Sequence, residues 1–249
     1  MQEISDIKTY AKSHDVPIMQ DGGIEFICQY IQEHDVKSVL EIGSAIGYSA
    51  IRFAKIKDNI KVTTIEIDLE RYIRAVQNIK DNGLNERISI YNADALTFET
   101  AEKFDLIFID AAKAQYIKFF EKYKNNLAQN GVIISDNLSF HGMVEDMSLT
   151  TNYSTIKLVR KIKKYVDFLK GNTEFHTDFY SIGDGISVSK RSYEVNKEEL
   201  PSSITLVETP LFEVSSTFIR ESLEKGKDIR YFVHPKVWER IIKIQKSTI

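Results

Sequence analysis

The sequence predicts an α/β fold with a doubly wound, mostly parallel seven-stranded sheet and a C-terminal antiparallel hairpin strand. Short β-rich apolar runs alternate with helical segments along most of the chain. This alternation is typical of parallel strands that form one sheet with helices on both faces. A Gly-Asp-Gly turn between two further β-rich runs predicts the hairpin. A small, mostly helical appendage is expected to follow.

The predicted elements follow in a regular order. Pro17 ends the first helix, because the residue before a proline is pushed out of the α region. The second helix carries Ile24, Ile27 and Ile31 on one face. The predicted helices cover residues 4–14, 23–34, a segment with Ile51 and Ala54 facing inward, 71–84 with Gly83 as C-cap, 114–127 and 153–170. The predicted strands cover residues 38–42, 61–68, 87–94, 104–110 and 131–137, and the hairpin covers 174–191.

Composition sets the domain organisation and excludes some functions. The α/β domain is predicted over residues 1–192, a polar linker with a proline over 193–203, and the appendage over 204–249. A formal net charge of -3 gives no global sign of nucleic-acid or membrane binding. Cys28 is the only cysteine, which excludes an internal disulfide, and it is interpreted as a packed apolar residue. A polar N-terminus and the lack of a membrane-spanning run predict a cytoplasmic protein without a membrane partner.

A glycine turn follows the first predicted strand, in LEIGSAIGYS. Gly43 and Gly47 are expected to let the backbone approach a ligand, and the helix that begins there offers free N–H groups to an anion. Ser44 stands where a dinucleotide fingerprint has its second glycine, which disfavours a pyrophosphate. A carboxylate fits this turn better, with Ser49 as a hydrogen-bond donor. Glu41, just before the turn, is assigned to the same cofactor site.

Acidic residues end the next two predicted strands. Glu66 lies about 20 residues after the glycine turn, where a carboxylate can accept hydrogen bonds from both hydroxyls of a ribose. Asp94 and Ala95 would flank an adenine. A ligand with a ribose, an adenine and an amino-acid end but no pyrophosphate is S-adenosylmethionine. Each feature alone also fits a tight turn or a solvated strand end, so the prediction depends on their order at consecutive strands.

Oxygen-bearing side chains end the fourth and fifth predicted strands. Asp110 ends FDLIFID, and Asp136 and Asn137 end GVIISDN. Neighbouring strand ends would bring the three together, and two carboxylates with an amide oxygen suit a hard cation such as Mg²⁺. Neither cysteine nor histidine accompanies them, which argues against zinc. The alternative is that Asp136 and Asn137 only cap the following turn.

Lys113 follows Asp110 by three residues. A metal there would hold a substrate oxygen and lower its pKa, and Lys113 would take or share the proton. Lys113 and Asp110 are therefore the predicted catalytic residues of an in-line methyl transfer. Exposed lysines at helix starts are common, although the helix dipole disfavours a cation there.

Six segments together resemble the metal-dependent class I O-methyltransferases of the catechol and caffeoyl-CoA type: VPIM, LEIGSAIGYSAIRFA, TIEID, NADAL, FIDAAKAQY and ISDNLSFHG. The resemblance covers about residues 4–191. It implies a Rossmann-like methyltransferase fold, S-adenosyl-L-methionine and Mg²⁺ as cofactors, and a homodimer. By motif it assigns Met19, Ser49, Glu66, Asp94, Ala95 and Asp110 to S-adenosylmethionine, Asp110, Asp136 and Asn137 to magnesium, and catalysis to Lys113.

A more specific resemblance indicates which molecule accepts the methyl group. The D-A-A-K-x-Q-Y segment with D-N-x-x-F-x-G is similar to bacterial tRNA 5-hydroxyuridine methyltransferases, which implies methylation in the tRNA anticodon to 5-methoxyuridine. A small catechol-like phenol and a non-catalytic RNA- or protein-binding module remain as alternatives. His141 is interpreted as a surface histidine. The predicted helix at 153–170 has one basic face, formed by Lys157, Arg160, Lys161 and Lys164. This face would contact RNA phosphates. The alternative is an ordinary solvated helix face.

Residues 205–243 resemble the C-terminal end of bacterial nicotinate-nucleotide adenylyltransferases. Ser215, Ser216 and Arg220 match its S-S-T-x-I-R motif. The H-x-G-H motif of those enzymes occurs nowhere in the chain. We therefore expect a remnant or an interaction module here rather than a second activity.

Overall fold

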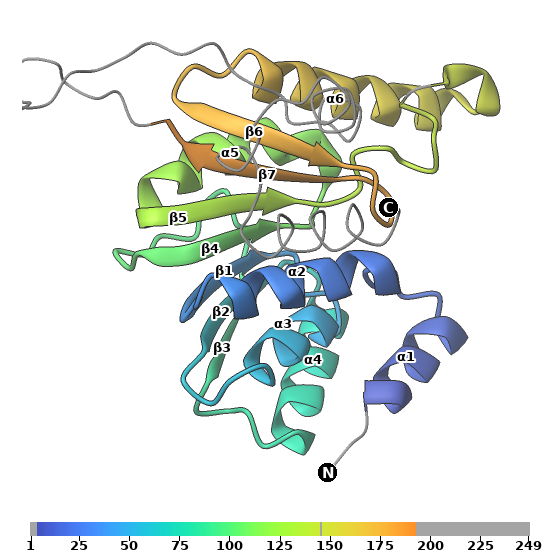
Figure 1. Cartoon of the computed structure of the whole chain (residues 1–249). Coiled ribbons are helices and arrows are strands. Elements are labelled where there is room, and N and C mark those ends of the chain that lie inside the picture. Colours follow the sequence, from blue (N-terminus) through green and yellow to red (C-terminus); the bar gives the residue numbers. More distant parts are fainter. Residues whose placement is uncertain (1–3, 145, 193–249) are drawn as a thin grey trace, which may run out of the picture. The chain divides into compact units, whose positions relative to one another are not determined.

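The computed structural model describes residues 4–144 and 146–192 (Figure 1). In this part of the chain seven strands form one sheet in the order β3-β2-β1-β4-β5-β7-β6. The strands β1 to β5 pair in parallel, and β7 pairs antiparallel with both β5 and β6. The predicted fold class, including the antiparallel hairpin, is confirmed. The strands are β1 (Ser38–Ile42), β2 (Lys61–Glu66), β3 (Ile88–Asn92), β4 (Phe104–Ile109), β5 (Leu127–Ser135), β6 (Phe175–Tyr180) and β7 (Ile186–Arg191).

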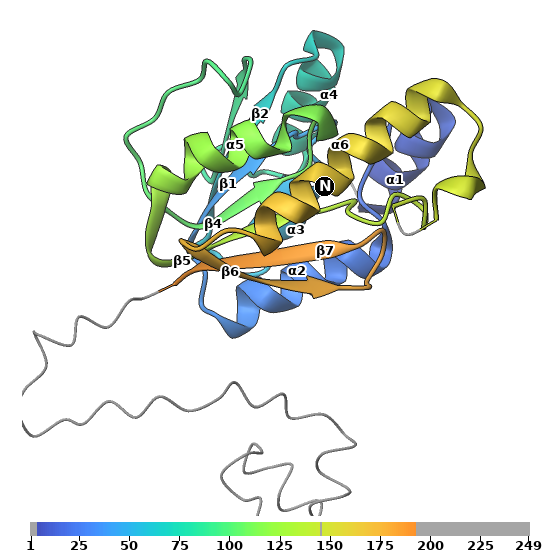
Figure 2. The same ribbon diagram turned by 90° about the horizontal axis from the view of Figure 1, so that it is seen from above.

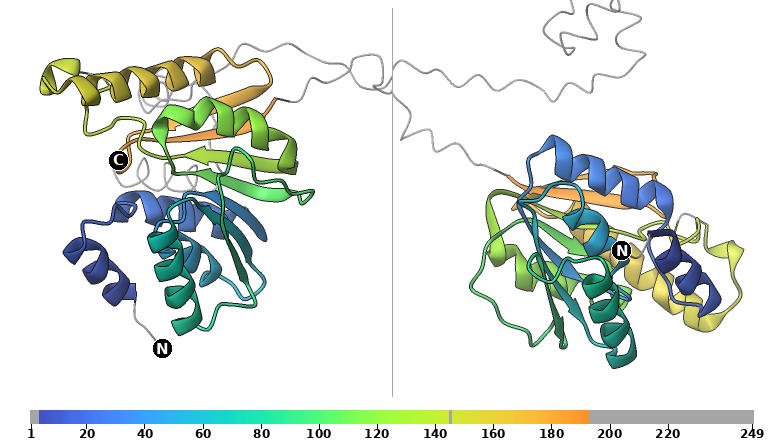
Figure 3. Two further views of the ribbon diagram at one scale, coloured as in Figure 1. Left: turned by 180° about the vertical axis from the view of Figure 1, so that it is seen from behind. Right: turned by 90° about the horizontal axis from the view of Figure 1, so that it is seen from below.

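Helices cover both faces of the sheet. Figure 2 shows α5 and α6 on the opposite side of the strands from α2, and Figure 3 shows α3 and α4 on the α2 side. α1 contacts α3. The helices are α1 (Ile4–Ser13), α2 (Asp21–Glu33), α3 (Tyr48–Ala54), α4 (Leu69–Asp81), α5 (Tyr116–Tyr123) and α6 (Tyr153–Lys170), with the 3₁₀ turns η1 (Lys113–Gln115), η2 (Lys124–Asn126) and η3 (Met147–Leu149).

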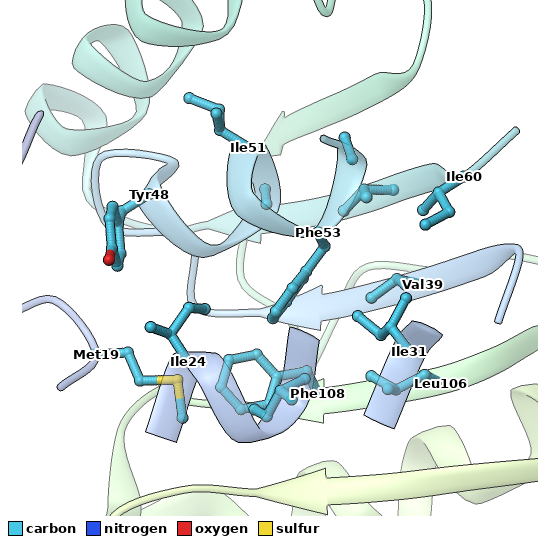
Figure 4. Packing of buried hydrophobic residues seen from close by; sticks show 14 of the residues in the cluster. Met19, Ile24, Ile31, Val39, Tyr48, Ile51, Phe53, Ile60, Leu106 and Phe108 are labelled. Atoms are coloured by element: carbon cyan, nitrogen blue, oxygen red, sulfur yellow. The ribbon is translucent and has the colours of Figure 1, made fainter. Parts of the chain in front are cut away.

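Side chains of β4 alternate between two apolar clusters. Leu106 and Phe108 face the cluster under α2 and α3, whereas Ile107 and Ile109 face the cluster under α5 and α6. Figure 4 shows Phe108 against Phe53 of α3, with ring centroids 5.7 Å apart in an edge-to-face arrangement. A strand buried on both faces reads as a continuous apolar run, which is why β4 was predictable. Packing on both sides holds the strand ends in place.

Several predicted boundaries differ from the structure, and two of the differences have a clear physical reason. α4 begins at Leu69 rather than residue 71, because Asp68 caps it by accepting the Arg71 N–H at 2.9 Å. The predicted helix at 114–127 is too long: α5 ends at Tyr123 and β5 begins at Leu127. The reason is tertiary, since buried Leu127 pairs in register with Phe104 of β4.

The predicted linker at 193–203 and appendage at 204–249, with Ser215, Ser216 and Arg220, lie outside the described residues. Within the described ranges, no helix has both the length and the apolar character that a membrane crossing requires. Cys28 is half-buried, and burial raises the pKa of its thiol to about 11, as suits a packed residue.

Candidate active site

A cavity of about 640 Å³ lies at the carboxyl ends of the parallel strands. Because these ends meet at one edge of the sheet, the side chains that follow each strand gather there. Two predicted cofactor residues, Glu41 and Gly47, lie outside its wall. The predicted residues that line the cavity are Met19, Gly43, Ser44, Ser49, Glu66, Asp94, Ala95, Asp110, Lys113, Asp136 and Asn137.

The glycine turn brings β1 and β4 together. Gly43 has φ +98°, and a Cβ there would lie 2.1 Å from the backbone oxygen of Asp110. Position 43 therefore requires a glycine because of the close backbone at the end of β4, as well as for any ligand that approaches. Gly47 lies against Ala75 of α4, so it serves helix packing rather than the cavity. Ser44 is 2% exposed, and its Oγ in the cavity wall has no hydrogen-bond partner among the described residues.

Glu41 lies behind the turn. It is fully buried and accepts hydrogen bonds from the hydroxyls of Ser49 and of Thr64, the latter at 2.5 Å. Burial raises the pKa of Glu41 to about 7, although these two hydrogen bonds oppose the shift. Glu41, which the sequence assigns to the cofactor site, lies outside the cavity wall. Glu41 instead orients Ser49, which does line the cavity.

Glu66 is held at the second strand end by the backbone. Its Oε2 accepts the Ala45 N–H at 2.7 Å and its Oε1 accepts the Asp68 N–H at 2.9 Å. The carboxylate is 6% exposed and keeps lone pairs for hydroxyl donors in the cavity. Asp94 and Ala95 line the same end of the cavity, next to β3. This end suits a sugar diol beside a flat ring.

Asp110, Asp136 and Asn137 are brought together as predicted. Asn137 donates through Nδ2 to Asp136 Oδ2 at 2.8 Å and to Asp110 Oδ1 at 3.3 Å. Its φ of +64° turns the amide back towards the strand ends. Tyr116 donates its hydroxyl to the backbone oxygen of Asp136 at 3.2 Å, which fixes the end of β5 against α5.

The two carboxylates repel each other in a region with little water. Burial raises the pKa of Asp110, and the nearby Lys113 ammonium opposes that shift. Burial and the charge of Asp110 together raise the pKa of Asp136 to about 7. A cation between them would relieve the repulsion, and a half-turn of the Asn137 amide would add its oxygen. No group of three or more His, Cys, Asp or Glu side chains in the described ranges could hold a metal, so an amide would supply the third donor.

Sequence reasoning missed one acidic residue of the cavity wall, whereas the exposed side chain of His141 agrees with its interpretation as a surface histidine. Asp184, between β6 and β7, lines the cavity and is 5% exposed. The Gly-Asp-Gly motif was interpreted only as a turn, although an acid between two glycines was the available signal. His141 also lines the cavity, with its side chain 63% exposed. Its backbone N–H donates to Asp184 Oδ1 at 2.5 Å.

Comparison with known proteins identifies the family. The O-methyltransferase family model matches residues 1–192. The chain belongs to the O-methyltransferase family. Its relatives are of the caffeoyl-CoA and catechol type. Catechol O-methyltransferase of Niastella koreensis is 31% identical over 157 residues, 60% of this chain and 68% of that protein. Caffeoyl-CoA O-methyltransferase of Stellaria longipes is 24% identical over 204 residues, 77% of this chain and 84% of that protein.

Solved structures agree with this assignment of the O-methyltransferase. A crystal structure of a protein of caffeoyl-CoA O-methyltransferase type from Staphylococcus aureus is 35% identical, with a TM-score of 0.74 over 77% of this chain and 93% of that one. An O-methyltransferase from Bacillus cereus, solved in complex with SAH, shares the fold at 22% identity, with a TM-score of 0.66 over 77% of this chain and 92% of that one.

A second, shorter similarity has a different character. Proteins named as nicotinate-nucleotide adenylyltransferases match over 57 residues at 51% identity in Bacteroides thetaiotaomicron and over 51 residues at 55% in Bacteroides fragilis. These matches cover 23% and 20% of this chain. The chain thus spans only 28% and 25% of the length of those two relatives.

The predicted RNA-contacting face of the O-methyltransferase lies apart from the cavity wall. Its members are exposed on α6: Lys157, Arg160, Lys161 and Lys164. α6 nevertheless contacts η1, the turn that carries Lys113.

Proposed function

We propose that this O-methyltransferase transfers the methyl group of S-adenosylmethionine to an acceptor hydroxyl held at a Mg²⁺ site of Asp110, Asp136 and Asn137. The observation that carries the proposal is the pair of carboxylates at neighbouring strand ends, bridged by one amide. They lie in the same cavity as the side chains that suit an adenosine. One cavity therefore offers sites for both a methyl donor and an acceptor oxygen.

The cofactor end fits S-adenosylmethionine through groups that the protein leaves open. The buried Ser44 hydroxyl, which has no partner in the described ranges, would donate to the methionine carboxylate. Glu66 would accept from the ribose hydroxyls, and its two backbone hydrogen bonds hold it in place. Asp94 and Ala95 would flank the adenine, and Met19 would cover the cofactor from the α1–α2 connection.

Lys113 would handle the acceptor proton. Bound Mg²⁺ would supply a positive charge that favours the anionic form of the acceptor oxygen. As a neutral amine, the Lys113 Nζ would take the hydroxyl proton; as an ammonium, it would share a hydrogen bond with the developing oxyanion while the new C–O bond forms and the sulfonium C–S bond breaks. The cavity walls hold the two reactants in line, which is a large part of the rate gain in such transfers.

The proposed acceptor is 5-hydroxyuridine at the wobble position of tRNA. The D-A-A-K-x-Q-Y and D-N-x-x-F-x-G segments support this choice, and the basic face of α6 offers contacts for phosphates. A catechol-like phenol is the second candidate, favoured by the similarity to the Niastella koreensis enzyme. A non-catalytic binding module is a third, and the presence of Asp110, Lys113, Asp136 and Asn137 in one cavity weighs against it.

Two wider proposals accompany this reaction. We propose a homodimer in the cytoplasm, to be tested by the mass of the protein in solution and by cell fractionation.

We propose that the segment similar to the Bacteroides proteins is a remnant or an interaction module without adenylyl transfer. Release of pyrophosphate from ATP and nicotinate mononucleotide would contradict this.

The reaction is tested with purified protein, labelled S-adenosylmethionine and two acceptors. One acceptor is tRNA that carries 5-hydroxyuridine, and the other is catechol. Methylation of the tRNA, with Mg²⁺ but not with EDTA, is expected. Methylation of catechol alone would select the second candidate, and no product from either would contradict the enzyme proposal. Transfer that persists in EDTA would remove the metal from the proposal.

A further inference from the structure

Asp184 holds the loop that follows β5. Its backbone oxygen accepts the Ser139 N–H at 2.8 Å, and its Oδ1 accepts the His141 N–H at 2.5 Å. Asp184 therefore fixes this loop at the cavity through one backbone oxygen and one carboxylate oxygen. The His141 ring Nδ1 lies 3.7 Å from the same Oδ1. Both contacts leave the second carboxylate oxygen unused.

The second oxygen, Oδ2, has no hydrogen-bond partner among the described residues. Asp184 is 5% exposed and lines the cavity. A buried carboxylate oxygen without a donor is unfavourable, because it loses its water and gains no replacement. A hydrogen-bond donor on a molecule bound in the cavity would satisfy this oxygen.

The sheet order decides which molecule that is. β7 begins just after Asp184 and pairs with β5 through Ser135 and Ser187, whereas β1 and β2 lie on the other side of β4. Figure 1 shows β7 on the far side of β5 from the cofactor strands β1 and β2. This strand order places Asp184 beyond Asp136 as seen from those strands. The charge of Asp184 also contributes to the raised pKa of Asp136, as expected for neighbours. Asp184 therefore lies on the acceptor side of the cavity.

We infer that Asp184 Oδ2 accepts a hydrogen bond from a ring N–H of the acceptor, on the same ring as the hydroxyl that is methylated. The inference rests on the proposed function and narrows the acceptor class. A carboxylate accepts hydrogen bonds and repels lone pairs, so it selects a donor. A 5-hydroxyuracil ring has such a donor at N3, beside the carbonyl at position 4. The second hydroxyl of catechol takes the place of the uracil 4-carbonyl, and the ring position that corresponds to N3 carries no donor, so Asp184 favours the uracil ring.

The test compares two substrates in two proteins. The substrates are anticodon stem-loop RNAs with 5-hydroxyuridine or its N3-methyl derivative, and the proteins are the wild type and Asp184→Asn. The Asn amide oxygen keeps the His141 hydrogen bond, and its NH₂ replaces Oδ2. The wild type should prefer the N3–H substrate in kcat/KM by about tenfold to hundredfold. Asp184→Asn should lose most of this preference, because only the steric effect of the methyl group remains.

Controls separate recognition from general damage. Asp105→Asn removes a carboxylate that also accepts backbone N–H groups, from Lys37 and Ser38 at the opposite edge of the sheet. It should keep the wild-type preference. If Asp184→Asn does not bind S-adenosylhomocysteine, and is therefore damaged as a whole, Asp184→Ser is used in its place. It too should lose most of the preference for the N3–H substrate.

An equal preference in the wild type and the Asp184 variant, with turnover in both, would overturn the inference and leave the proposed function intact. A wild type that methylates neither RNA with Mg²⁺ present would instead overturn the tRNA proposal, and the inference with it. The two failures are thus distinguishable.

Discussion

Asp110 and Asp136 end adjacent parallel strands, and the charge of Asp110 adds to burial in raising the pKa of Asp136 to about 7. One amide, that of Asn137, donates to both carboxylates. This arrangement is unfavourable for the protein by itself and favourable for a cation. The repulsion between the two carboxylates destabilises the folded protein, and a bound divalent cation would remove this destabilisation.

Asp136→Asn should stabilise the metal-free protein at about pH 8, by on the order of 2 kcal/mol, because it removes a buried charge. Mg²⁺ should raise the melting temperature of the wild type and leave that of the variant unchanged. Thermal unfolding with Mg²⁺ and with EDTA measures both effects. An equal response to Mg²⁺ in the two proteins would contradict the assignment of Asp136 as a ligand.

Glu41→Gln should change how stability depends on pH. The pKa of Glu41 rises from 4.5 to about 7 on folding, so the folded state binds its proton more tightly. Its stabilising contribution is complete below about pH 4.5 and is lost as the pH rises to about 7, a loss of about 3 kcal/mol. The wild type should therefore lose stability across this window relative to the variant. Urea unfolding measures this, with exposed Glu86→Gln as control. Parallel curves for wild type and Glu41→Gln would count against the shift.

Lys113→Ala should lower kcat by about 10²- to 10⁴-fold, because the hydroxyl that is methylated loses the Nζ that takes or shares its proton. Binding of S-adenosylhomocysteine should change little, since the assigned cofactor contacts come from other residues. Single-turnover kinetics and a binding titration separate the two effects. Lys118→Ala, an exposed lysine of α5, is the matched control. Equal losses in turnover and cofactor affinity would show that Lys113 has another role.

Ser44→Ala should separate stability from cofactor binding. Its buried hydroxyl has no partner in the described ranges, so removal should increase the free energy of unfolding by about 1 kcal/mol. Affinity for S-adenosylmethionine should fall by about threefold to tenfold. Ser187→Ala removes another buried hydroxyl without a partner in those ranges, outside the cavity wall. It should stabilise equally and leave affinity unchanged. Unaltered affinity in Ser44→Ala would remove Ser44 from the cofactor site.

Replacement of Lys157, Lys161 and Lys164 by Gln should weaken tRNA binding and reduce its salt dependence. Each phosphate contact that is lost should lower the slope of log affinity against log salt by about 1. Filter binding at several salt concentrations gives the slope. The double variant Lys12→Gln, Lys80→Gln removes charge from α1 and α4 and should leave the slope unchanged. An unchanged slope in the α6 variant would locate RNA binding elsewhere.

The sheet and most of the site were predictable because they depend on local pattern. The apolar run of β4 and the acids at successive strand ends need no long-range information. The position of Glu41 outside the cavity wall was not predictable, because a carboxylate in a strand can face a ligand or an internal hydroxyl pair, and only the packing of Ser49 and Thr64 decides. Asp184 was missed because its place in the site depends on β7 lying beside β5.

A crystal structure with Mn²⁺ and S-adenosylhomocysteine tests the central claim most directly, since Mn²⁺ scatters anomalously and prefers the same oxygen ligands as Mg²⁺. We predict one anomalous peak about 2.1–2.3 Å from side-chain oxygens of Asp110, Asp136 and Asn137, with the cofactor sulfur facing it across the cavity. A peak at other residues, or none in a crystal that contains the cofactor, would contradict it.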